Sequence, residues 1–109
     1  MTTPANYFHV LRRQMLRNFR KPLIIAAPKI GLKHPMAVSP IQDMGHGKSF
    51  QPILVNSFGK EGPVEEVVIC SGKIYFDISA KLADSQRNVK VIRVEELAPF
   101  PSALIESQL

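Results

Sequence analysis

The chain has 109 residues, enough for one small domain or a piece of a larger protein, and 45% of them are hydrophobic, which can supply a core. Lysine and arginine outnumber aspartate and glutamate by 14 to 9, and the net charge of +5 is compatible with an acidic or phosphate-bearing partner. The one cysteine excludes an internal disulfide, and no apolar run approaches the roughly 20 residues that span a membrane. We therefore expect no membrane association, and we expect no targeting signal in this chain.

The first predicted element is a helix over residues 6–19. Thr3 followed by Pro4 is typical of a helix start, with Thr3 as the N-cap and Pro4 in the first turn. Apolar side chains at helical spacing predict that one side of the helix is buried. These side chains are Tyr7, Phe8, Leu11 and Met15. His9 lies near this side, where a hydrogen-bonded packing role is commoner than lining a site.

Five cations lie on this helix and directly after it, and two interpretations of them stay open. They are Arg12, Arg13, Arg17, Arg20 and Lys21. They form a solvated face with favourable positive charge at the helix C-terminus. Alternatively, they contact a phosphate or carboxylate, because arginine pairs with either group through two hydrogen bonds.

The middle of the chain predicts one strand, a long connection and a second strand. Residues 22–28 are an apolar run between two prolines, which predicts a strand buried in a parallel sheet. Residues 29–48 are rich in glycine and proline and predict a connection with at most a short helix at residues 38–44. Residues 51–55 predict an edge strand, since Pro52 cannot donate to a ladder, and a loop follows at residues 57–63.

Residues 66–95 have the pattern of a complete strand, helix and strand unit. The β-branched runs at residues 66–70 and 89–94 predict two strands, the first buried on both faces. They are most simply parallel neighbours joined by a right-handed crossover. Cys70, in the first strand, is expected to be a small buried thiol.

Between these strands we predict a helix from residue 73 to about residue 87. Ile74, Ile78 and Leu82 recur at helical spacing, and Tyr75 and Phe76 are expected in the core. Near the end of the chain, Ser102 can cap a final helix over residues 103–109.

These elements predict an α/β fold with an open, mostly parallel sheet and flanking helices. A sheet with so few strands would leave apolar faces bare. No helix stop signal follows the final helix. We therefore expect the chain to be part of a longer polypeptide.

The motifs of known phosphate-binding loops are incomplete here. Ser71, Gly72 and Lys73 stand between a strand and a helix. The phosphate-binding loop motif, however, requires glycine at position 67, where this chain has valine, and serine or threonine at position 74, where it has isoleucine. The dinucleotide fingerprint needs three glycines at this turn, and only one is present. The helix N-terminus near Lys73 still offers free backbone N–H groups to an anion.

No metal site is expected, because the spacing of the candidate ligands matches no zinc pattern. These candidates are His34, Asp43, His46 and Cys70.

Five ordered blocks, covering nearly the whole chain, resemble a known family. They are residues 6–14 (NYFHVLRRQ), 19–24 (FRKPLI), 28–29 with 34–35 (PK and HP), 70–77 (CSGKIYFD) and 93–101 (RVEELAPFP). They resemble the thiamine-diphosphate-dependent decarboxylating component of the 2-oxoglutarate dehydrogenase complex, and particularly its 2-oxoadipate dehydrogenase-like relatives. Several blocks with similar gaps are far more specific than any one of them.

The resemblance implies a domain organisation. Residues 1–29 would be the end of a pyrimidine-binding transketolase-like domain, comprising a helix and a strand. Residues 30–63 would be a connecting segment, and residues 64–109 would be the start of a C-terminal α/β domain.

The resemblance also implies the activity of the parent enzyme. Members of the family decarboxylate 2-oxoglutarate or 2-oxoadipate on thiamine diphosphate with Mg²⁺ and pass the acyl group to a lipoyl arm. The segments that bind the cofactor and the substrate lie upstream in the family. We therefore expect no catalytic, cofactor-binding or metal-binding residue here, and this chain alone is expected to be inactive.

The implied partners are the remainder of the parent polypeptide, an identical subunit in a homodimer and the dihydrolipoyl acyltransferase component. Neither nucleic acid nor a membrane is expected as a partner. The implied location is the mitochondrial matrix in a eukaryote and the cytoplasm in a bacterium.

The resemblance further implies a regulatory site. Some members bind nucleotides or acyl-CoA where the two domains join, through basic residues that include the arginine of a Leu-Leu-Arg motif. Lys33 stands at that position here; it keeps the charge and loses the planar guanidinium. We therefore expect a weak anion site at Lys33, with Lys29 and Lys73 as further candidate contacts.

Three functions stay open. The preferred one is a catalytically incomplete part of a 2-oxo acid dehydrogenase that serves domain packing, dimer assembly and regulation. The second is a free-standing, non-catalytic binding module derived from that family. The third is a nucleic-acid-binding domain that uses residues 12–21, and it is disfavoured because the nearby aromatic residues are better explained as core than as base-stacking groups.

Overall fold

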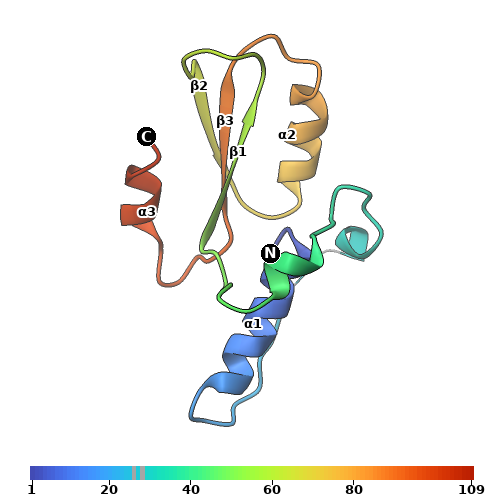
Figure 1. Ribbon diagram of the computed structural model, residues 1–109, viewed down its shortest axis with the longest axis vertical. Coiled ribbons are helices and arrows are strands. Elements are labelled where there is room, and N and C mark those ends of the chain that lie inside the picture. The colour runs from blue at the N-terminus through green and yellow to red at the C-terminus, as the bar shows by residue number, and fades with distance from the viewer. Residues whose placement is uncertain (26, 28) are drawn as a thin grey trace. The chain divides into compact units, whose positions relative to one another are not determined.

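The computed structural model describes residues 1–25, 27 and 29–109. It comprises two compact units, the N-terminal unit Met1–Gln51 and the C-terminal unit Pro52–Leu109. The elements are α1 (Pro4–Leu16), the 3-10 helices η1 (Lys29–Leu32) and η2 (Ile41–Met44), β1 (Ile53–Phe58), β2 (Glu66–Cys70), α2 (Ile74–Leu82), β3 (Val89–Val94) and α3 (Ser102–Glu106) (Figure 1).

No helix among the described residues is both long enough and apolar enough to span a membrane.

The predicted cap of α1 is confirmed, although the helix begins at Pro4, two residues before the predicted residue 6. The Thr3 side chain accepts a hydrogen bond from the Asn6 amide at 3.2 Å, and Pro4 is in the first turn. The helix ends at Leu16, three residues before the predicted end, because Arg17 is extended with ψ of 144°. The turn that follows is held by Arg20, which donates to the carbonyls of Arg17 and Phe19 at 3.1 and 3.2 Å.

The prediction of which side of α1 is buried is wrong. The four apolar residues expected on the buried side are all exposed, namely Tyr7, Phe8, Leu11 and Met15. The buried residues of α1 are Asn6, His9 and Val10. Hydrogen bonds of a polar residue determine which side is covered. Asn6 donates to the Gln51 carbonyl and accepts from the Gln51 amide, both at 2.9 Å. These bonds hold residues 43–51, the returning segment, against the Asn6 side of the helix.

The strand predicted at residues 22–28 is also wrong where it is described. Residues 22–25 and 27 have no regular secondary structure, and the Ile24 side chain is 90% exposed. Residues 26 and 28 lie outside the described residues. A strand needs a hydrogen-bonded neighbour, and no described strand pairs with this segment.

The connection that follows matches its prediction in part. Helix η2 lies within residues 38–44, where a short helix was predicted. Helix η1 was not predicted, because residues 29–32 carry little helical periodicity.

The C-terminal unit contains a three-stranded mixed sheet with the order β1-β3-β2. Strands β2 and β3 are parallel, with Val68 opposite Val91, which confirms the predicted pairing. Strand β1 is antiparallel to β3, with Val55 opposite Ile92, so the sheet is mixed and not mostly parallel. β1 continues to Phe58, and the predicted loop at residues 57–63 therefore begins two residues later.

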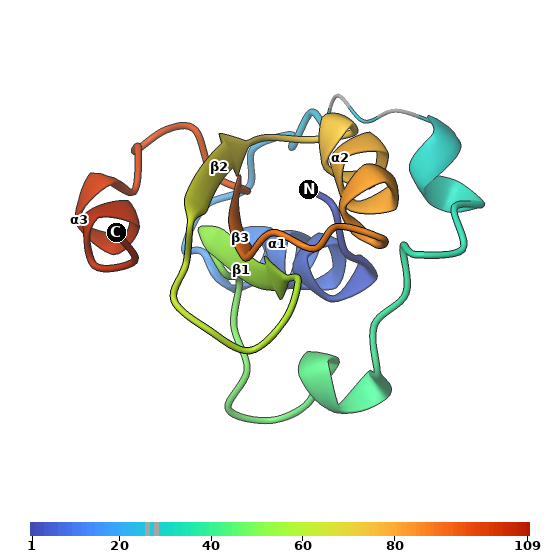
Figure 2. The same cartoon turned by 90° about the horizontal axis from the view of Figure 1, so that it is seen from above.

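Two helices lie on opposite faces of this sheet, α2 on one side and α3 on the other (Figures 1 and 2). Alternate residues of β3 face each helix. Ile92 and Val94 form a core cluster with Ile105 of α3. On the other face, the Arg93 guanidinium carbon lies 3.9 Å from the centre of the Tyr75 ring in α2. The central and most buried strand of the sheet is therefore β3.

Burial of β2 on both faces was predicted and is wrong. Ile69 is 50% exposed, and Cys70 is only half-buried. The reason is topological, because β2 is an edge strand with one neighbour and the central place belongs to β3.

The helices of this unit are shorter than predicted. α2 buries Tyr75, Phe76 and Ser79, whereas Ile74 is exposed. It ends at Leu82, not near Arg87, because the Ser85 hydroxyl accepts a hydrogen bond from the Arg87 amide at 3.1 Å and bends the chain.

The final helix is also shorter and starts differently. α3 ends at Glu106, and Ser102 is its first residue, while Pro101 is the N-cap without a side-chain hydrogen bond. Lys90 of β3 donates to the Gln108 carbonyl at 2.8 Å, which ties the end of the chain to the sheet.

The loop between β1 and β2 is fastened to the start of β3. The Asn88 carbonyl accepts hydrogen bonds from the amides of Glu65 and Glu66 at 2.8 and 3.3 Å. Gly59 has φ of +101°, and a Cβ atom there would lie 2.2 Å from the Arg87 carbonyl oxygen. Only glycine fits this turn.

Candidate functional site

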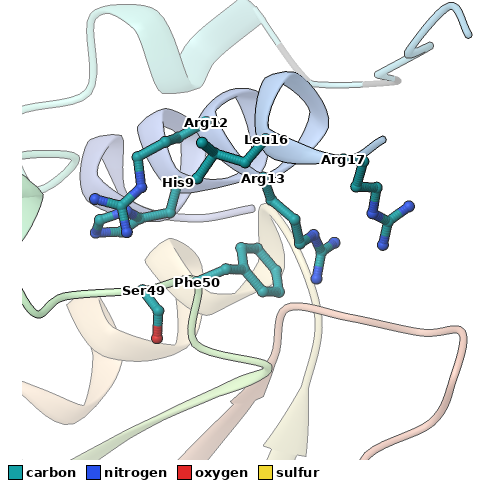
Figure 3. Close-up of a pocket in the computed structure, with 7 residues that line it drawn as sticks. All are labelled: His9, Arg12, Arg13, Leu16, Arg17, Ser49 and Phe50. Atoms are coloured by element: carbon teal, nitrogen blue, oxygen red, sulfur yellow. The ribbon is translucent and has the colours of Figure 1, made fainter. Parts of the chain in front are cut away.

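A hollow beside α1 is one candidate site of the N-terminal unit. We call it the α1 hollow; it has a volume of about 370 Å³ (Figure 3). It is lined by His9, Arg12, Arg13, Leu16, Arg17, Ser49 and Phe50. Three of the five cations singled out from the sequence therefore line one hollow, and Arg20 and Lys21 do not.

Local structure explains how the α1 hollow is assembled. Arg13 lies in the last turn of α1 and Arg17 is its C-cap, and Figure 3 shows both side chains extending away from the helix in the same general direction. Phe50 comes from the returning segment, which the Asn6 and Gln51 hydrogen bonds hold against the helix. The Arg13 guanidinium carbon lies 4.5 Å from the centre of the Phe50 ring, a cation–π contact.

The other two arginines of the hollow are also positioned. Arg12 donates to the Lys48 carbonyl, and its guanidinium carbon lies 5.9 Å from the centre of the Phe8 ring. Arg17 lies 5.6 Å from the centre of the Phe19 ring. Neither Arg12 nor Arg17 forms an ion pair with any described residue.

His9 contributes a buried imidazole to the α1 hollow. Its side chain is 2% exposed, and its Nε2 lies 2.7 Å from the Asp43 carbonyl oxygen. Because a carbonyl oxygen only accepts, Nε2 carries the proton and donates it. Nδ1 is buried and has no hydrogen-bond partner among the described residues. The predicted packing role is confirmed, and His9 also lines the hollow.

A second hollow surrounds η1, and we call it the η1 hollow. It has a volume of about 730 Å³ and is lined by Lys29, Ile30, Leu32, Lys33, His34 and Pro35. Two of the predicted anion contacts, Lys29 and Lys33, therefore line the same hollow. Lys73 belongs to the C-terminal unit, at the start of α2, and its grouping with them stays a prediction.

The described residues do not fit a site for Mg²⁺. No three histidine, cysteine, aspartate or glutamate side chains among them are placed to hold a metal ion. Burial raises the pKa of Cys70, and the negative charge of Glu95 raises it further, while the positive charge of nearby Arg93 opposes both. Cys70 is therefore a protonated thiol at neutral pH. A thiol with a raised pKa is a poor nucleophile.

Residues 38–109 match the family model described as 2-oxoglutarate dehydrogenase C-terminal. The chain belongs to this family. The family resemblance predicted from the five sequence blocks is thereby confirmed.

Individual relatives of this 2-oxoglutarate dehydrogenase family match nearly the whole chain. Over 111 residues it is 47% identical to the "2-oxoadipate dehydrogenase complex component E1" of Danio rerio and 45% identical to that of Homo sapiens. Each match covers 99% of this chain and 12% of the relative. The "2-oxoglutarate dehydrogenase, mitochondrial" of Caenorhabditis elegans is 42% identical over 112 residues, 98% of this chain and 11% of that protein. The chain thus spans about an eighth of the length of these relatives.

Sequence reasoning found the arginines of the α1 hollow and missed its other side. Ser49 and Phe50 carry no motif, and they reach α1 only because the chain returns to it at residues 43–51. One feature of the sequence could have indicated this contact. Asn6 and His9 are polar residues about one helical turn apart, and both bind backbone groups of the returning segment.

Proposed function

We propose that this chain is part of the decarboxylating component of a 2-oxo acid dehydrogenase that acts on 2-oxoglutarate or 2-oxoadipate. Its contribution is domain packing and dimer assembly together with regulation by an anion. The observation that carries the proposal is the similarity to such components over 98–99% of the chain. The domain organisation expected from the resemblance, with boundaries at residues 29 and 63, is part of this proposal.

In this proposal the reaction centre lies elsewhere in the parent polypeptide. Thiamine diphosphate with Mg²⁺ supplies the carbanion chemistry there. The partners of the chain are the remainder of that polypeptide, an identical subunit and the dihydrolipoyl acyltransferase component. The location is the mitochondrial matrix in a eukaryote and the cytoplasm in a bacterium.

A replacement experiment tests the proposal. In a full-length 2-oxoadipate dehydrogenase component E1, the matching 111-residue stretch is exchanged for this chain. We expect a chimera that is dimeric and decarboxylates its 2-oxo acid with thiamine diphosphate and Mg²⁺. The matched controls are the intact relative and the same relative with the stretch deleted.

Two results would count against the proposal. One is a measurable decarboxylation rate from the isolated 109-residue chain with the same cofactors, because catalysis would then lie within it. The other is a chimera as inactive as the deletion, although this chain alone is folded. That second result would favour a free-standing binding module.

The η1 hollow is the proposed place of anion regulation. It is supported by Lys29 and Lys33, which line the same hollow, and no residue of acidic character lines it with them. An ammonium binds phosphate as a point charge, so the site is expected to be weak. AMP and acetyl-CoA are the probes, and binding is followed by the amide shifts of residues 29–34.

Substitutions at Lys33 sharpen this test. Lys33→Gln should abolish the shifts, and Lys33→Arg should strengthen binding because it restores the planar fork. Lys60→Gln, which removes the same charge from the C-terminal unit, is the matched control. Unchanged amide shifts with both probes would remove the regulatory part of the proposal and leave the structural part standing.

A further inference from the structure

One side of α1 presents a row of large apolar side chains that the described residues leave exposed. We call it the α1 strip; it consists of Tyr7, Phe8, Leu11 and Met15. At 3.6 residues per turn these positions share one side of the helix, opposite the side that carries the buried residues. A contiguous apolar row on a protein surface marks a contact with another segment or molecule. The α1 strip is therefore a candidate docking surface.

Positive charge lies beside the α1 strip and at its C-terminal end. The Arg12 guanidinium carbon lies 5.9 Å from the centre of the Phe8 ring, and that of Arg17 lies 5.6 Å from the centre of the Phe19 ring. Neither arginine forms an ion pair with a described residue. Residues 1–42 contain no aspartate or glutamate at all. Carboxylates that complement this border therefore have to come from outside residues 1–42.

Two other occupants of the α1 strip fit less well. A second copy of the strip would bring arginines together without a carboxylate between them, which is unfavourable. Helices that lie on a membrane surface expose a polar face rich in lysine and arginine. In α1 the side opposite the strip is instead buried, and Asn6 and His9 bind backbone groups of the returning segment there.

The size of the α1 strip favours a partner on the same polypeptide. It is about 12 Å long, because residues 7 and 15 are eight positions apart and each adds about 1.5 Å. Its partly exposed side chains offer on the order of a few hundred Å², below the roughly 800 Å² that each partner buries in a stable complex. A tethered segment needs less contact, because its effective concentration is high. This chain spans 12% of its Danio rerio and Homo sapiens relatives, so a polypeptide of that length has room for such a segment.

We propose that the α1 strip packs against an acidic amphipathic helix of the parent polypeptide, outside the stretch that this chain represents. Apolar side chains three and four residues apart on that helix cover Leu11 and Met15. Carboxylates along its border pair with Arg12 and Arg17 through two hydrogen bonds each. The inference rests on the function proposed above and deepens it, because it names the chemistry of the segment against which α1 packs.

The accessibility of position 15 tests the packing. Met15→Cys places a thiol in the strip, where the native side chain is 66% exposed, both in the isolated chain and in the chimera described above. Maleimide labelling, located by mass spectrometry, should be about tenfold slower in the chimera, because a covered thiol reacts only after local opening. Gln42→Cys, at an exposed position of η2, is the matched control and should label at the same rate in both proteins.

A crosslink from position 12 identifies the partner helix. Arg12→Lys keeps the positive charge and supplies a primary amine, which a carbodiimide couples to a carboxylate in direct contact. The amide bond forms with the loss of water, which the carbodiimide takes up. In the chimera we expect a crosslink to an acidic residue of the same polypeptide, outside the exchanged stretch, with a second acidic residue three or four positions away. Gln42→Lys should not give this crosslink.

Several results would overturn the inference. Fast labelling of Met15→Cys in a dimeric, active chimera would remove it and leave the proposed function standing. Equal slowing in Gln42→Cys would mean general burial of the unit. Slow labelling without a crosslink would mean a partner without the acidic border, and a crosslink to a second polypeptide, seen as a larger band on a denaturing gel, would mean a different source. A chimera that does not assemble would overturn the proposed function and this inference together.

Discussion

Asn6 is a buried polar residue that fastens two segments of the N-terminal unit to each other. It is only 2% exposed, and its amide group pairs with both backbone groups of Gln51 as a neighbouring strand would. This pairing explains why a polar residue occupies the buried side of α1. A buried amide with its hydrogen bonds satisfied can therefore decide which face of a helix is covered.

Replacing Asn6 by alanine should release the returning segment. Asn6→Ala leaves the Gln51 amide and carbonyl without these partners, at a cost of about 2 kcal/mol. Hydrogen exchange at the Gln51 amide should accelerate accordingly. The exposed Asn18→Ala is the matched control, and unchanged protection of Gln51 in Asn6→Ala would contradict this account.

Cys70 should react slowly with alkylating reagents at neutral pH. Its pKa is raised above the ordinary value of 9.0, mainly because burial disfavours the thiolate. The rate of alkylation against pH should therefore have its midpoint above 9.0 in the folded chain and return towards 9.0 in urea. Glu95→Gln should lower the midpoint, since Glu95 also raises this pKa.

The raised pKa of Cys70 also makes the stability of the fold depend on pH. The unfolded thiol loses its proton at a lower pH than the folded thiol, so the unfolded state binds fewer protons between the two pKa values. The contribution to folding is therefore complete below the unfolded pKa and is lost as pH rises towards the folded pKa. An alkylation midpoint at or below 9.0 in the folded chain would refute both statements.

At the scale of elements, the turn after β1 is the position most sensitive to substitution. Gly59→Ala places a methyl group against the Arg87 carbonyl in a backbone conformation that only glycine adopts easily. The expected loss is about 2–4 kcal/mol in the free energy of unfolding, measured by urea denaturation.

Gly72 provides the control in the same unit. It has φ of +70°, and an added Cβ would meet nothing within 4 Å, so Gly72→Ala should cost only the backbone strain of about 1 kcal/mol. Equal losses at the two glycines would show that the close approach to Arg87 does not matter.

The sequence predicted some elements well for a clear physical reason. Strands β2 and β3 have the predicted bounds because β-branched runs specify them locally, and the Thr3 cap fixes the start of α1. Helix ends were predicted less well, because side-chain hydrogen bonds such as that of Ser85 to the Arg87 amide end them early. The burial of each face depends on contacts distant in sequence, which periodicity does not contain.

The residues of the candidate site were likewise predictable only where the signal is local in sequence. The arginines of the α1 hollow were visible as a cluster of charge on one helix. Phe50 was not, because its place beside Arg13 requires the chain to return across some 37 residues, which no local pattern encodes. Lys29 and Lys33 were found through family resemblance, and η1 brings them to one hollow.

At the scale of the whole molecule, the charge is unevenly divided between the two units. The C-terminal unit holds six lysines and arginines against eight acidic residues, so the net positive charge lies entirely in the N-terminal unit. A charge of this kind attracts polyanions through counterion release, without any recognition of sequence.

Binding to nucleic acid should therefore be weak and depend only on salt. We expect that mixed DNA and RNA bind at low ionic strength and are released at about 150 mM salt, without preference among sequences. Fluorescence anisotropy over a salt series measures this. Binding that persists at physiological salt would revive the nucleic-acid-binding alternative.

The open border of β2 carries a practical consequence. The border strand exposes Ile69 and has its partner β3 on one side only, so its outward backbone groups can serve as a template for a strand of another molecule. Purified material should accordingly self-associate as its concentration rises. A charged residue in place of Ile69 should keep it monodisperse without disturbing the interior, because that side chain contributes little to the core.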